Sequence, residues 1–89
     1  MFYYVYVLFN IKDKGIYTGF TDNLSRRIKE HQRGLVESTK DRQPLKLLYF
    51  EGYLDKKSAM SREKYLKTGW GRNYLQKVVK DFVNNNPKI

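Results

Sequence analysis

The chain has 89 residues, and 18 Lys and Arg against 9 Asp and Glu give it a net charge of +9. This length predicts one small domain, residues 1–89, with a single modest core. The lack of cysteine excludes a disulfide framework and a thiolate metal site, and it fits a cytoplasmic setting. The longest apolar run, residues 3–9, is too short to span a bilayer. A charge this high points to a polyanion, and nucleic acid is favoured over an acidic membrane surface or no polyanionic partner at all.

Residues 1–20 predict a β-hairpin that begins with a central strand. Residues 1–9 are β-branched and aromatic without alternation, which suits a strand covered on both faces. A polar turn follows, and residues 15–20 predict the second strand. A turn centred near residues 11 and 12 would place Tyr6 opposite Tyr17, within ring contact. A register shifted by one residue would instead separate the two phenols.

The second strand is expected to lead through a tight turn into a helix. Gly19 and the polar residues after it mark this turn, and either Asp22 or Asn23 can cap the helix. The helix is expected over about residues 23–32 and should stop near Gly34.

The apolar face of this first helix carries an arginine and a histidine. With Leu24 at zero and 100° per residue, Ile28 lies at about 40°. On the same wheel His31 lies at about −20° and Arg27 at about −60°, whereas Arg26 falls on the far side. A helix that only packs would carry Leu or Ala at these positions, so the pair indicates a functional site. The alternative for the histidine is ordinary packing with satisfied ring nitrogens.

The segment from residue 35 to residue 44 is a polar loop with several hydrogen-bonding and cationic side chains. Ser38, Thr39, Lys40 and Arg42 are placed to lie along a phosphate backbone. An ordinary solvated loop explains the same composition, and the sequence does not separate the two interpretations.

Residues 45–53 predict a third strand, and two helices follow it. Asp55 can cap the second helix, over about residues 56–68, and the third begins at Gly71 or Arg72. The order is therefore ββαβαα. This order predicts an α+β domain with a small three-stranded antiparallel sheet flanked by helices.

The second helix carries a carboxylate in the middle of its apolar stripe. With Ala59 at zero, Leu66 lies near −20° and Glu63 near 40°. A buried carboxylate without a partner is costly, so Glu63 needs a cation, a hydrogen bond or a metal ion. The structural alternative to a metal site is an ion pair of Glu63 with Arg27 or Arg62.

Both helices are expected to pack on the sheet face that bears Tyr6 and Tyr17. Phosphodiester cleavage needs groups of these kinds: a hard oxygen ligand for Mg²⁺, a guanidinium for the phosphate charge, and a histidine or phenolate that takes a proton from water. A tyrosine in that role would have to be acidified by nearby cations. Taken singly, each tyrosine is also explained as an ordinary aromatic of the sheet.

In this order and spacing, the residues resemble the motifs of the GIY-YIG endonuclease superfamily. Residues 4–6 and 17–19 resemble its two triplets, ten residues apart, with tyrosine and valine where the first triplet of the family has glycine and isoleucine. Arg27, His31 and Glu63 follow in the family's order. The resemblance covers nearly the whole chain. It is strongest to the short stand-alone bacterial members, which are related to the N-terminal domain of the excision-repair nuclease.

The resemblance implies an endonuclease that hydrolyses DNA with one Mg²⁺ or Mn²⁺. Glu63 would be the metal ligand and Arg27 would neutralise charge on the phosphate. Tyr17 or Tyr6, assisted by His31, would activate the attacking water. Gly19 matches the glycine that lets the backbone turn sharply after the second triplet.

The expected substrate is DNA, branched or damaged DNA included, in repair or recombination, and a protein partner is left unspecified. The main alternative is a non-catalytic nucleic-acid-binding module that keeps the same fold. A third is a recruitment domain whose aromatic surface docks a protein. No membrane partner is expected. Five residues are candidate nucleic-acid contacts, the last as a match to the family's late asparagine: Arg26, Lys40, Arg42, Arg72 and Asn73.

Overall fold

The computed structural model describes residues 1–88, and residue 89, the last of the predicted domain, lies outside the described residues. Within residues 1–88 the order ββαβαα is confirmed, as is the α+β class with its three-stranded antiparallel sheet. Among these described elements, no helix is long and apolar enough to cross a membrane. The elements are β1 (Tyr3–Asn10), β2 (Ile16–Thr21), α1 (Leu24–Gln32), β3 (Leu45–Tyr53), α2 (Lys56–Leu66) and α3 (Gly69–Asn85).

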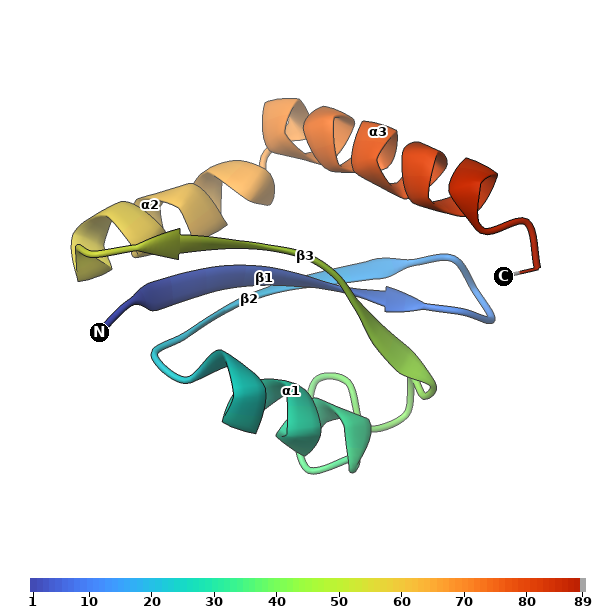
Figure 1. Cartoon of the computed structure of the whole chain (residues 1–89), viewed down its shortest axis with the longest axis horizontal. Coiled ribbons are helices and arrows are strands. Elements are labelled where there is room, and N and C mark those ends of the chain that lie inside the picture. The colour runs from blue at the N-terminus through green and yellow to red at the C-terminus, as the bar shows by residue number, and fades with distance from the viewer. Residues whose placement is uncertain (89) are drawn as a thin grey trace.

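The central strand of the sheet is β1, and the strand order is β2-β1-β3 (Figure 1). Its residues 5–10 are all buried, because helices cover both faces of the sheet. α1 lies on one face, whereas α2 and α3 lie on the other (Figure 1). The prediction that α1 and α2 share one face is therefore wrong. The apolar stripe of a helix shows that the helix packs, but it does not select the face of the sheet.

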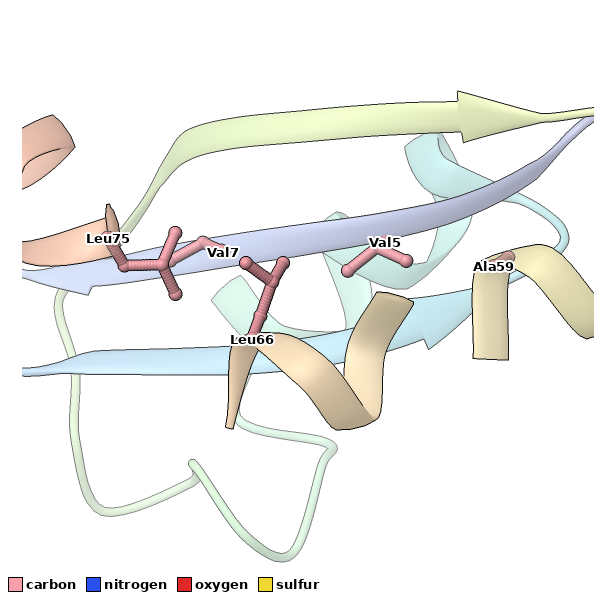
Figure 2. Close-up of a cluster of buried hydrophobic side chains, with 5 residues drawn as sticks. All are labelled: Val5, Val7, Ala59, Leu66 and Leu75. Carbon is pink, nitrogen blue, oxygen red and sulfur yellow. The ribbon is translucent and has the colours of Figure 1, made fainter. Parts of the chain in front are cut away.

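Successive side chains of β1 alternate between two separate hydrophobic clusters. Val5 and Val7 point toward α2 and α3, where they pack against Ala59, Leu66 and Leu75 (Figure 2). The side chains between them point the other way, toward α1. This second cluster comprises Tyr6, Leu8 and Leu45, with Tyr17, Leu24, Ile28 and Leu47 packed against it.

The register of the hairpin differs from the predicted one by two residues. Tyr6 pairs with Gly19, and Tyr17 pairs with Leu8. The turn is centred one residue later than predicted, because the Asn10 side chain accepts hydrogen bonds from two backbone N–H groups of the loop. A shift of two residues preserves the face of each side chain. Both phenols therefore still lie on the α1 side, with ring centroids 6.4 Å apart.

Polar caps set the helix boundaries. Asn23, one of the two candidates, caps α1, and Asp55 caps α2 as predicted. Thr68 caps α3, so α2 ends at Leu66 and α3 begins at Gly69, earlier than predicted. An oxygen-bearing side chain at this position satisfies a free N–H of the next helix and so separates the two helices.

Candidate active site

The two phenols share one sheet face but differ in exposure. Tyr6, on the central strand, is 1% exposed, whereas Tyr17, on the edge strand, is only partly buried. The Tyr6 ring lies across Gly19, where a Cβ would come within 2.4 Å of the Tyr6 hydroxyl. The strand continues past this glycine to Thr21. Gly19 therefore makes room for a ring, and the prediction that it serves a sharp turn is wrong.

His31 joins Tyr6 to the loop that follows α1. Its Nε2 lies 2.8 Å from the Tyr6 hydroxyl, and its Nδ1 lies 2.7 Å from the hydroxyl of Thr39. All three side chains are buried. Thr39 was expected only as part of a polar loop along a phosphate backbone. The sequence carries no signal for its contact with His31, because an irregular loop brings the two together.

The buried histidine is neutral at neutral pH. Burial lowers the pKa of His31, the positive charge of Arg27 lowers it further, and Glu30 offsets part of the shift. With one proton on the ring, the hydrogen bonds run in one of two directions. Either Tyr6 donates to the ring and the ring donates to Thr39, or both bonds are reversed.

Tyr6 is a neutral phenol in this setting. Burial raises the pKa of Tyr6, and electrostatic interactions with Tyr17 and Glu63 add to the effect. A hydrogen bond and the positive charge from Arg27 lower the pKa but do not cancel the rise. The expectation that neighbouring cations acidify the tyrosine is therefore wrong for Tyr6.

Arg27 lies where the apolar face of α1 meets the surface, as its wheel position predicts. Its hydrogen bond to Tyr6 is the main cause that raises the pKa of the guanidinium, and Glu30 contributes too. The Arg27 Nη1 lies 3.1 Å from the Glu30 carboxylate. The guanidinium is thus held by two partners.

Glu63 approaches from the opposite face of the sheet, on α2. Its side chain is 23% exposed, and its carboxylate accepts a hydrogen bond from Lys67 at 3.1 Å. An ion pair with Arg27 or Arg62 is the predicted alternative to a metal site at Glu63. Neither arginine forms an ion pair with it. Arg62 binds Glu51 through two hydrogen bonds instead.

One side of α2 faces the edge strand β2. Lys56, Glu63 and Lys67 are spaced seven and four residues apart, so they lie on one side of the helix. Lys56 lines a pocket of about 290 Å³ beside the end of β2, and Lys67 lines one of about 410 Å³ beside its start. Glu63 therefore lies between the two pockets, which we name the Lys56 pocket and the Arg72 pocket.

Five of the candidate residues line these two pockets, whereas Tyr6, His31 and Glu63 line neither. Arg26 and Arg27 line the Lys56 pocket. Tyr17, Arg42 and Arg72 line the Arg72 pocket.

Two predicted nucleic-acid contacts fall outside this arrangement. Lys40 forms an ion pair with Glu37 at 3.2 Å, and Asn73 is exposed on α3. Neither lines one of the two pockets.

The donor set at Glu63 suits a cation that keeps most of its water. Among the described residues no three His, Cys, Asp or Glu side chains cluster to form a metal site made of protein alone. Mg²⁺ is commonly held by one or two carboxylates, several waters and a substrate phosphate. The Lys67 ammonium against Glu63 shows that a cation fits beside this carboxylate.

Comparison with known proteins assigns the family. The GIY-YIG catalytic domain matches residues 2–76. The chain belongs to the GIY-YIG family. The GIY-YIG domain is a nuclease-type fold, and the family prediction from the sequence is confirmed. The roles of the individual site residues stay predictions.

Relatives of similar length carry the name UPF0213. A UPF0213 protein of Clostridium perfringens is 49% identical over 65 residues, which cover 72% of this chain and 69% of that protein. One of Bacillus licheniformis is 34% identical over 89 residues, which cover 96% and 91%. The solution NMR structure of a UPF0213 protein from Bacillus halodurans is similar, with a TM-score of 0.53, 33% identity and coverage of 88% and 85%.

Proposed function

We propose that this GIY-YIG domain is a divalent-metal-dependent endonuclease that hydrolyses phosphodiester bonds in DNA. The observation that carries the proposal is the position of Glu63 between two cationic pockets, one lined by Tyr17 and the other by Arg27. A scissile phosphate at this position would meet a carboxylate, a phenol and a guanidinium that come from three different elements. A pure binding surface has no need of the carboxylate.

The burial of the two tyrosines supports different roles for them. Tyr17 is partly exposed and lines the Arg72 pocket, so it is the phenol that can orient or deprotonate an attacking water. Tyr6 is enclosed and neutral, and it holds the ring of His31. We therefore assign Tyr17 to the water and make Tyr6 and His31 positioning residues.

Two groups would neutralise the charge on the phosphate, and they lie on different sides of it. Arg27 presents a guanidinium fork whose geometry matches two phosphate oxygens. Glu63 would hold Mg²⁺ or Mn²⁺ in place of the Lys67 ammonium. When bound, such an ion supplies Lewis-acid stabilisation to phosphate and leaving-group oxygens. Released from Glu63, Lys67 would remain beside the phosphate in the Arg72 pocket.

We place the activity in the cytoplasm and expect branched, nicked or damaged DNA as the substrate in repair or recombination. The basis is that the described helices and strands, within residues 1–88, all belong to one α+β domain built on the same sheet. Cleavage selected by DNA structure needs contacts to the backbone rather than to base edges.

The proposal is tested by incubating the purified protein with branched, nicked, single-stranded and duplex DNA, with and without Mg²⁺ or Mn²⁺. We expect metal-dependent cleavage that falls at least 100-fold in Glu63→Gln, because one missing electrostatic contact in a transition state costs a factor of this order. Glu37→Gln, which removes an exposed carboxylate elsewhere, serves as the matched control.

Thermal unfolding of both variants separates loss of chemistry from loss of fold. Full cleavage by a folded Glu63→Gln would overturn the assignment of the metal ligand. Tight DNA binding by the wild type without cleavage of any substrate would instead establish the non-catalytic binding module.

A further inference from the structure

The two pockets along β2 are the more basic ones of the described surface: three basic side chains line each, against one in the pocket beside the start of α1 and two in the pocket around Ser58 and Ser61. Within residues 1–88, ion pairs engage Arg26, Arg42 and Lys67, but none engages Lys56 or Arg72. Lys56 lines one pocket and Arg72 lines the other. A cation that is not neutralised inside the protein is available to a phosphate.

The positions of these two cations are not explained by helix stability. Lys56 is the first residue of α2, and Arg72 lies in the first turns of α3. The positive end of the helix dipole disfavours basic side chains there, and neither helix has an acidic residue in its first turn. A cation retained against this effect indicates a partner outside the helix.

The pockets lie at the two ends of the same strand. The Arg72 pocket contains Ile16, Tyr17 and Thr18, whereas the Lys56 pocket contains Phe20 and Thr21. Six residues of strand at roughly 3.3 Å each span about 20 Å, so a ligand must be extended to reach from one pocket to the other. Gly19 lies between the pockets, and the candidate catalytic residues lie around it.

We infer that one nucleic-acid strand lies lengthwise along the β2 edge, its phosphates held by Lys56 at one end and by Arg72 at the other. The inference rests on the proposed function, since it places the scissile phosphate between the two pockets, and it adds Lys56 as a substrate-binding residue. The recognised chemistry is an extended phosphodiester backbone. A dinucleotide reaches only one pocket.

A larger, apolar pocket does not compete for this ligand. It measures about 740 Å³ and is lined by Met1, Phe2 and Tyr4 together with the start of α1. Lys29 is its single basic residue, whereas the Lys56 pocket, which shares Asp22 with it, has three. A polyanion therefore has its best electrostatic match at the β2 edge.

The experiment measures binding in EDTA, by fluorescence anisotropy for labelled single strands of eight nucleotides and by NMR titration for dinucleotides. We expect Lys56→Met and Arg72→Met each to weaken binding of the eight-nucleotide strand about 3- to 10-fold. Each should also reduce the slope of log K against log salt by about 0.7, the value for one phosphate contact to a single strand. The double variant should show the product of the two effects.

Lys46→Met is the matched control, because it removes one exposed charge from β3, at the opposite edge of the sheet. In Lys56→Met, the gain in affinity between two and eight nucleotides should largely disappear. The inference is overturned if Lys56→Met binds like Lys46→Met, or if it keeps the full gain with length. Because no metal is present, a protein that never cleaves DNA can still pass this test, so the two proposals fail separately.

Discussion

At the scale of single residues, the site depends on a ring that fills the space above a glycine. Tyr6 cannot move aside, because it is enclosed and its hydroxyl is hydrogen-bonded to His31. His31 is held in turn by Thr39. A side chain added at Gly19 would therefore displace Tyr6 and, through it, His31.

We predict that Gly19→Ala abolishes most DNA cleavage and lowers the free energy of unfolding by about 1–3 kcal/mol, the usual cost of an overpacked methyl group. The reason is the 2.4 Å approach of the added Cβ to the Tyr6 ring. Cleavage assays and urea denaturation would measure the two effects. Gly69→Ala, where a Cβ meets nothing within 4 Å, is the control. Wild-type stability in Gly19→Ala would contradict the packing argument.

The buried histidine predicts a pH dependence of stability. Because burial lowers the pKa of folded His31, the unfolded chain binds more protons than the folded one below the unfolded value of about 6.5. The free energy of unfolding should therefore fall as the pH drops from 7 to 5, with a limiting slope of about 1.4 kcal/mol per pH unit. Urea denaturation at several pH values would measure it.

His31→Gln supplies the control for this slope. The chain has one histidine, and the carboxylates with lowered pKa, Glu51 and Asp55, titrate below this window. The variant is expected to be less stable overall but to lose the slope between pH 7 and pH 5. If the slope persists in His31→Gln, another titrating group causes it.

The face of a helix on which a residue lies could be predicted from the sequence, whereas contacts made by loop residues could not. The 100° periodicity placed Arg27 and His31 on the buried face of α1, where they lie. It placed Glu63 in the middle of the apolar stripe of α2, whereas the structure shows a side chain that is 23% exposed and paired with Lys67. No periodicity governs residues 35–44, so the burial of Thr39 beneath His31 came only from the structure.

At the scale of elements, the sheet separates the helices that carry the site. α1, which carries Arg27 and His31, lies on one face, and α2, which carries Glu63, lies on the other (Figure 1). The two sets of groups can meet only around the edge strand β2. The order of elements and their lengths were predictable from polar caps and hydrophobic runs. The face chosen by each helix was not, because every amphipathic helix satisfies its own apolar stripe equally well on either side.

The rotation of α2 about its axis is fixed by a cluster on its other side. Arg62 donates two hydrogen bonds to Glu51 of β3, at 2.9 and 3.1 Å, and the hydroxyls of Tyr49 and Tyr53 bind the same carboxylate. Burial raises the pKa of Glu51, but these hydrogen bonds outweigh it and leave the pKa below the usual range. Arg62 directly precedes Glu63, so the cluster also sets the position of the candidate metal ligand.

We predict that Arg62→Met lowers the free energy of unfolding by about 1–2 kcal/mol, because a partly buried carboxylate loses its cation. Cleavage should fall only partly, since Glu63 itself remains. Lys64→Met, an exposed position on the same helix, should change neither quantity appreciably. Urea denaturation and cleavage rates measured side by side would check this. Equal stability of the two variants would show that the cluster does not anchor α2.

At the scale of the whole molecule, the net charge is +9, but the basic side chains differ in whether a nearby carboxylate neutralises them. Several cations are neutralised by carboxylates on the same or a neighbouring element, as the ion pairs of Arg26 and Lys40 illustrate. At the β2 edge, three basic side chains line each of two pockets. Composition alone predicted a polyanionic partner, and the edge proposed to meet it follows only from the fold.

The position of β2 at the margin of the sheet has a further consequence. Within residues 1–88 this strand pairs with β1 alone, so one row of its backbone N–H and C=O groups has no strand beside it. An open margin of this kind invites a second copy to add its own strand, which is the first step toward aggregation. Lysine and arginine side chains around the margin make two copies repel each other there. The features that suit the molecule to a polyanion therefore also protect it from polymerising with itself.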